Sequence, residues 1–123
     1  MPPRGNPVPN EPAAANAGDL PPRLLQETAS MFALLSATVR LHILWLLADG
    51  DRDVGSLAVQ TGQSVATVSH HLAKLKLAGL VDLDRHGKRH VYTATDPHVL
   101  EVIELAIGAR LEESAPRRPV RHA

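Results

Sequence analysis

Two adjacent histidines, His70 and His71, lie within the regular apolar pattern of TVSHHLAKLKLAGLV. Histidine binds metals and transfers protons, so the pair raises two kinds of chemistry. A shared metal is disfavoured because neighbouring helical residues point about 100° apart. Catalysis is disfavoured because the chain has no nucleophile and base at suitable spacing, no phosphate-binding loop and no HExxH pattern. The sequence therefore predicts a binding surface here and a protein that is not an enzyme.

The residues around this pair have the chemistry of a DNA-recognition helix. Ser64 is a suitable N-cap, and an apolar stripe follows at helical spacing, formed by Val65, Val68, Leu72 and Leu75. Polar side chains lie off the stripe, where they can reach base edges and phosphates. The DNA-contacting residues predicted on this helix are Gln63, Ser64, Thr67, Ser69, His70, His71, Lys74 and Lys76. Taken alone, the helix is equally explained by a solvated outer face.

After Gly79 the apolar spacing changes from helical to alternating. Residues 80–84 and 89–93 flank a turn that contains Gly87, which is a hairpin signal. Basic side chains gather at its tip, where a wing would contact backbone phosphate, namely Arg85, His86, Lys88 and Arg89. Between residues 64 and 93, five Lys and Arg residues and two Asp residues leave a net charge of +3. The helix, the glycine break and the basic hairpin together favour DNA binding.

Capping and stop signals place three helices before this unit. The first is expected to begin after Asp19 as its N-cap, and the second at Ser36 or Thr38. The third covers residues 54–61 and ends at Gly62. These helices supply the rest of a Leu, Val, Ile and Ala core.

One more helix follows the hairpin, with Asp96 as its N-cap and Pro97 at the first helical position. The order helix, helix, short helix, helix, hairpin, helix is that of a winged helix-turn-helix with one helix added at each end. The predicted fold class is therefore mainly α, with an α+β winged helix-turn-helix.

Composition limits the number of domains, the chemistry and the location to be expected of this chain. The 123 residues suffice for one domain, and they contain no cysteine, which excludes disulfides and thiolate chemistry. Basic and acidic residues number 13 each, so a polyanion partner is indicated by local charge rather than by net charge. No signal peptide or membrane-spanning segment is recognised, which predicts a cytoplasmic protein without a membrane partner. Proline-rich ends predict a disordered tail over residues 1–19, a domain over 20–113 and a flexible basic tail over 114–123.

The stretch LLSATVRLHILWLLADGDRDVGSLAVQTGQSVATVSHHLAKLKLAGLVDLDRHGKRHVYTA resembles the ArsR/SmtB family of winged-helix repressors, and the resemblance extends over about residues 24–111. Its most specific parts are LLSATVRLHIL, TVSHHLAKLKLAGLV and RHGKRHVYT. The resemblance implies a homodimer formed by the first and last helices. It also implies binding to an inverted repeat in double-stranded operator DNA and release when an effector binds.

The resemblance also limits which kind of effector to expect. Many relatives bind metal through cysteines on the third helix, where this chain has Asp53 and Gly55. Other relatives use an Asp-x-His pair on the last helix together with two residues of the partner subunit. Asp96 and His98 match the pair, whereas the partner positions hold Glu112 and, in place of the usual histidine, Ala109. The metal ligands that the resemblance implies are Asp96, His98 and Glu112, for a divalent ion such as nickel or zinc, with cobalt as a further candidate.

Two alternatives stay open at this point. Asp96 is already explained as a helix cap and His98 as a first-turn residue, so the regulator could have no direct metal effector or could be controlled by a partner protein. From a different class, the chain could be a winged-helix module that binds other proteins without DNA. The basic hairpin tip argues against that second alternative.

Overall fold

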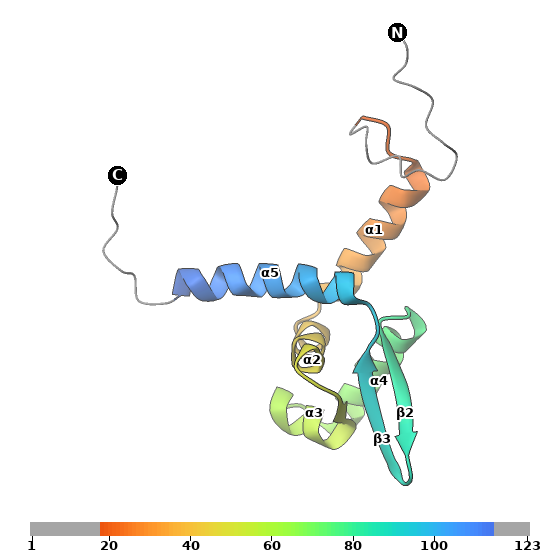
Figure 1. Cartoon of the computed structure of the whole chain (residues 1–123), viewed down its shortest axis with the longest axis vertical. Helices are drawn as coiled ribbons and strands as arrows, with labels where there is room; N and C mark the ends of the chain where they lie inside the picture. The colour runs from red at the N-terminus through yellow and green to blue at the C-terminus, as the bar shows by residue number, and fades with distance from the viewer. Residues whose placement is uncertain (1–17, 115–123) are drawn as a thin grey trace. The chain divides into compact units, whose positions relative to one another are not determined.

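The computed structural model describes residues 18–114, and most of both predicted tails lies outside this range. The chain divides into two units between Leu34 and Leu35. Helix α1 (Pro22–Leu35) makes up most of the described part of the first unit. The second unit contains α2 (Thr38–Ala48), β1 (Arg52–Asp53), α3 (Val54–Thr61), α4 (Val65–Leu77), β2 (Val81–His86), β3 (Arg89–Ala94) and α5 (Pro97–Ser114) (Figure 1). The predicted winged helix-turn-helix order is confirmed, and one short strand is added to it.

Helix α2 is the central element of the second unit, because it contacts α3, α4, α5 and β3. Its buried side chains are Ile43, Leu44 and Leu47. The other buried apolar side chains of this unit come from every remaining helix and from the hairpin, and include Leu57, Val68, Leu72, Leu75, Val81, Val91, Val99 and Ile103. Helix α4 is therefore held by a core that is built almost entirely from aliphatic residues.

Helix boundaries mostly follow the predicted caps. Helix α3 ends at the predicted Gly62, which has a φ of 71°, a conformation that glycine adopts at little cost. It begins at a side-chain cap that was not predicted, Asp53. At α2 the N-cap position is Ala37, which makes no side-chain cap hydrogen bond. The Asp19 prediction was wrong, because α1 begins at Pro22 and Pro21 occupies the preceding position. The ring of Pro22 disfavours a helical conformation at Pro21, so the helix cannot extend back toward Asp19.

The apolar stripe of α4 is one residue shorter than predicted. Val68, Leu72 and Leu75 are fully buried, whereas 51% of Val65 is exposed. Val65 lies in the first turn of the helix, where residues 63–66 are all exposed. The N-terminal end of α4 therefore extends beyond the core, and its apolar anchoring begins at Val68.

The sheet has the strand order β1-β3-β2, with both pairings antiparallel. The β2–β3 pairing extends from Val81 opposite Ala94 to His86 opposite Arg89 and leaves a two-residue turn at Gly87 and Lys88. Gly87 has a φ of 64°, which a tight hairpin turn requires. Strand β1 pairs Asp53 with Val91, and its two residues are too few to produce an alternating pattern in the sequence.

Within residues 18–114, no single helix is long and apolar enough to cross a membrane, although α1 and α2 taken together pass the same test as a broken pair by length and composition alone.

Candidate nucleic-acid interface

The N-terminus of α4 is organised by its cap. Ser64 Oγ accepts a hydrogen bond from the backbone N–H of Thr67 at 3.0 Å, and the two hydroxyl oxygens also lie 3.0 Å apart. Gln63 and Ser64 are exposed, while Thr67 is half-buried. Two of the predicted contact residues, Ser64 and Thr67, thus bind each other and determine where the helix begins.

The outer face of α4 is polar and basic. Ser69, His70, Lys74 and Lys76 are exposed, whereas Val68, Leu72 and Leu75 of the same helix are buried. Because the apolar side anchors the helix in the core, these four side chains are held on one stable element rather than on a loop. They can donate to phosphate oxygens and base edges, and Ser69 can also accept.

His71 is the exception on this face. Its ring is half-buried, and its Nδ1 accepts a hydrogen bond from Arg40 Nη1 of α2 at 3.2 Å. A guanidinium is always a donor, so Nδ1 carries no proton and the neutral ring is protonated at Nε2. Burial lowers the pKa of His71, and the neighbouring positive charges of Arg40, His70 and Lys74 lower it further. The ring is turned toward α2. His71 therefore has a structural role that competes with its predicted contact to DNA.

The paired rings of His70 and His71 do not form a metal site. Their centroids lie 5.6 Å apart, and the ring planes are inclined at 69° to each other. Across residues 18–114, no group of three His, Cys, Asp or Glu side chains is placed to hold a metal ion within a single chain. The two histidines therefore have different environments, one exposed and one partnered.

The hairpin formed by β2 and β3, here called the wing, carries the second group of basic side chains. Arg85, Lys88, Arg89 and His90 are exposed around its tip, and the side chain of His86 is not described. Helix α4 contacts β2, so the wing adjoins the helix that carries Lys74 and Lys76 (Figure 1). The fold thus places the two basic segments on elements that pack together, with the wing residues toward the tip of the hairpin.

One wing residue has an acidic partner that the sequence did not reveal. Arg89 Nη2 lies 3.2 Å from Asp53 Oδ2, across 36 positions of sequence. The pKa of Asp53 is lowered mainly by the backbone N–H of Ser56, with further contributions from the Ser56 side chain and from Arg89. An Asp before a helix predicts a cap, but no local signal predicts its second partner.

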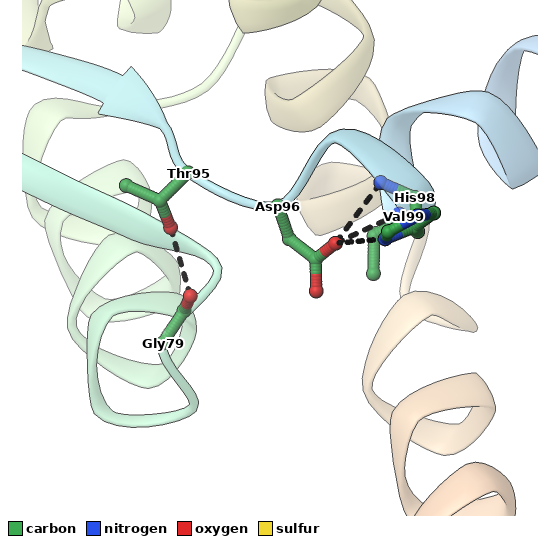
Figure 2. Close-up of polar contacts among 5 residues, drawn as sticks. All are labelled: Gly79, Thr95, Asp96, His98 and Val99. Carbon is green, nitrogen blue, oxygen red and sulfur yellow. Dashed lines mark hydrogen bonds and ion pairs between the residues drawn. The ribbon is translucent and has the colours of Figure 1, made fainter. Parts of the chain in front are cut away.

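The beginning of α5 places the two proposed metal ligands next to the end of α4. Asp96 Oδ1 accepts from the backbone N–H groups of His98 at 3.0 Å and Val99 at 3.3 Å, which confirms the predicted cap (Figure 2). The preceding Thr95 donates its hydroxyl to Gly79 O at 2.8 Å and its backbone N–H to Leu80 O at 3.0 Å. Thr95 thus attaches the start of α5 to the segment that terminates α4.

The donors available to a metal here are one carboxylate and one imidazole. His98 Nδ1 lies 3.9 Å from Asp96 Oδ1, and the His98 side chain is 91% exposed. Glu112 is also exposed, but it follows His98 by 14 positions, which corresponds to roughly 21 Å along a helix. One protomer therefore supplies only two of the three predicted ligands to a given site, and Glu112 could contribute only from a second protomer.

Comparison with known proteins agrees with this architecture. A helix-turn-helix with an added wing is the architecture of a DNA-binding regulator. The profile of the family described as "Bacterial regulatory protein, arsR family" matches residues 38–82. The transcriptional regulator KmtR of Mycobacterium tuberculosis is 38% identical over 93 residues, which cover 75% of this chain and 70% of KmtR. The chain belongs to the ArsR family and is a transcriptional regulator rather than an enzyme.

Two further relatives are informative. A cadmium resistance regulatory protein, a CadC homologue of Staphylococcus aureus, is 34% identical over 89 residues, covering 72% of this chain and 74% of the homologue. The solution structure of Mb0332 from Mycobacterium bovis, a homodimeric winged helix-turn-helix DNA-binding domain, matches with a TM-score of 0.66 and 32% identity. That match covers 84% of this chain and all of the Mb0332 fragment. The family resemblance and the fold predicted from the sequence are confirmed.

Proposed function

We propose that this regulator binds an inverted repeat in operator DNA as a homodimer, with α4 in the major groove and the wing on the adjacent backbone. The observation that carries the proposal is the outer face of α4, where Ser69, His70 and Lys74 are exposed on a helix anchored by fully buried aliphatic residues. The exposed basic side chains of the wing support it, because cations on an adjoining element can neutralise phosphates. The proposed contacts are Gln63, Ser64, Thr67, Ser69, His70, His71, Lys74, Lys76, Arg85, His86, Lys88 and Arg89.

A homodimer is supported by apolar side chains on the first and last helices. On α1, Leu24, Leu25 and Phe32 are 42–52% exposed, and on α5 Leu105 is 74% exposed. Apolar surface of this kind is typically covered by a partner. The homodimeric state of Mb0332 supports the same assignment. A two-fold dimer would present two α4 helices roughly 34 Å apart, the repeat of one DNA turn.

Operator binding is tested with a fluorescent duplex selected from a random-sequence library by the unmodified protein. Affinity is measured by anisotropy over a range of salt concentrations. We expect log K to fall steeply with log salt, and replacement of Arg85, Lys88 and Arg89 by Ala to reduce the slope by about 0.9 for each lost phosphate contact. The absence of any selected duplex, or binding unaffected by the triple substitution, would contradict the proposal. The second outcome would favour a wing that binds protein instead.

We further propose that a divalent metal, nickel or zinc, modulates operator affinity through Asp96 and His98 of one protomer and Glu112 of the other. The residues present fit such an ion in part, because a carboxylate and an imidazole are exposed together at the start of α5. Oxygen and nitrogen donors suit these metals, with cobalt as a further candidate. The cadmium resistance named for the CadC homologue supports a metal effector in general. Ala109 at the fourth ligand position favours the alternative of a regulator controlled by a partner protein.

The metal site is tested by calorimetry with nickel, zinc and cobalt salts. Asp96→Asn retains an N-cap of similar strength, so it changes the ligand and not the helix start. We expect Asp96→Asn, His98→Ala and Glu112→Gln each to weaken binding by at least about tenfold, since even supporting residues around metals have effects of that size. The control Glu101→Gln alters another exposed carboxylate of α5 and should have no effect. Equal metal binding by all variants would exclude this site.

A further inference from the structure

Asp53 occupies the junction of three elements. It is the last residue of β1, it lies opposite Val91 of β3, and it is the N-cap of α3. Its Oδ1 accepts from the backbone N–H of Ser56 at 2.8 Å, so the orientation of the carboxylate is set by the start of α3. The second oxygen, Oδ2, is then left facing β3, where Arg89 lies at 3.2 Å.

The Asp53–Arg89 contact holds the wing at a point beyond the last backbone pair between β1 and β3. Strand β1 pairs with β3 only as far as Val91, and Arg89 lies two positions closer to the tip. Between the start of α3 and this part of β3 is a hollow of about 360 Å³, lined by Asp53, Val54, Gly55, Lys88, Arg89 and His90. The ion pair lies along this hollow, on the tip side of the last backbone pair between β1 and β3.

We infer that Asp53 is a positioning residue for DNA binding, whose carboxylate holds Arg89 and the wing tip at the orientation required by the operator backbone. The inference rests on the proposed function. The inference predicts the direction in which DNA affinity changes when Asp53 is replaced. This direction is informative because Asp53 is a negative charge beside a surface proposed to bind a polyanion. Simple electrostatics predicts that removing this charge tightens DNA binding. Positioning predicts that removing it weakens binding.

Asp53→Asn separates the two effects. Asparagine is as good an N-cap as aspartate, so the amide oxygen can keep the hydrogen bond from Ser56 N. The other atom of the amide is then an NH₂ donor, which cannot accept from Arg89. The substitution therefore removes the wing contact and leaves α3 capped. Asp53→Ser, which also caps a helix but is too short to reach Arg89, gives a second version of the same change.

The experiment measures affinity for the selected duplex by anisotropy, with thermal unfolding as a check on folding. We expect Asp53→Asn and Asp53→Ser to weaken binding about two- to fivefold, which is within the range that an exposed ion pair contributes. The control Asp82→Asn removes an equal charge from β2, where Asp82 Oδ1 accepts from Leu83 N and lies opposite Thr93. We expect this control to bind with unchanged or higher affinity.

A double-substitution cycle shows whether Asp53 acts through Arg89. Arg89→Gln should weaken binding and reduce the salt slope by about 0.9, whereas Asp53→Asn should leave the slope unchanged. Once Arg89 is replaced, adding Asp53→Asn should cause no further loss. Unchanged or tighter binding by both Asp53 variants, or additive losses in the cycle, would overturn the inference while the proposed function stands. Failure of the unmodified protein to select any duplex would instead overturn both.

Discussion

At the scale of single residues, the long-range polar contacts assign different roles to similar side chains. His70 is exposed on the outer face of α4, while His71 accepts a hydrogen bond from Arg40 and is half-buried. In the same way, Arg89 is paired with a carboxylate that is itself oriented by a helix cap. Side chains that look alike in the sequence are thus of two kinds. Some face solvent, and others connect two elements through a hydrogen bond or an ion pair.

The environment of His71 predicts a pH-dependent stability. Its pKa is lowered in the folded protein below its ordinary value of about 6.5, so the unfolded chain takes up the proton first. The contribution of His71 to stability is therefore complete above that value and is lost as the pH falls below it. We expect the midpoint of thermal unfolding to fall between about pH 7.5 and about pH 5.5, and His71→Gln to reduce this fall. The control is His70→Gln, and an equal reduction in both variants would argue against the role assigned to His71.

At the scale of elements, each helix that borders the proposed interface begins at a specific cap. Ser64 caps α4, Asp53 caps α3 and Asp96 caps α5. At the other end of α4, Gly79 N donates to Lys76 O and Leu80 N donates to Leu75 O, which is the pattern of a Schellman motif. Thr95 then binds the carbonyl groups of Gly79 and Leu80. Helix α4 thus has a hydrogen-bonded cap at each end, and the segment that follows it is bonded to the start of α5.

The cap of α4 is expected to contribute to both stability and DNA affinity. Ser64→Ala removes the acceptor for Thr67 N and should destabilise the fold by about 1 kcal/mol, whereas Ser64→Asp retains a capping oxygen and should cost less. Chemical denaturation measures this difference. Ser64→Asp also places a negative charge at the proposed interface, so it should weaken DNA binding while preserving stability. Equal stability of Ser64→Ala and the unmodified protein would show that the cap is dispensable.

At the scale of the whole molecule, six of the nine exposed large apolar side chains of residues 18–114 lie on α1 and α5. On α5, Val102, Leu105 and Leu111 are exposed, while Val99 and Ile103 on the same helix are buried in the second unit. A helix with apolar residues on both its buried and its exposed sides is consistent with packing on two partners. This distribution supports the homodimer of the proposed function.

The dimer is tested by placing a charge on this surface. Leu105→Glu should shift the protein toward monomer in sedimentation velocity and weaken operator binding, because a charge buried at an apolar interface is strongly unfavourable. The matched control is Leu77→Glu at the end of α4, where the side chain is 91% exposed and lies on neither α1 nor α5. We expect the control to leave the oligomeric state unchanged. A protein that remains dimeric with Glu at position 105 would place the interface elsewhere.

The sequence alone was sufficient for features that depend on neighbours along the chain. The α3 stop at Gly62, the cap at Ser64, the buried stripe from Val68 and the turn at Gly87 all follow from local periodicity and local backbone preference. These signals repeat within a few residues, so they can be read without knowing the fold. They were enough to predict the winged helix-turn-helix, whereas the family was predicted from the resemblance of the quoted motifs.

Only the tertiary structure decided which polar side chains have partners that are distant in the sequence. Strand β1 exists because two residues pair with β3, and Arg40 reaches His71 across 31 positions while Arg89 reaches Asp53 across 36. Contacts of this kind depend on where the packed core places each element, and no local pattern encodes them. The same packing left Val65 exposed and turned His71 toward α2, because the depth of each side chain is set by the elements that surround it.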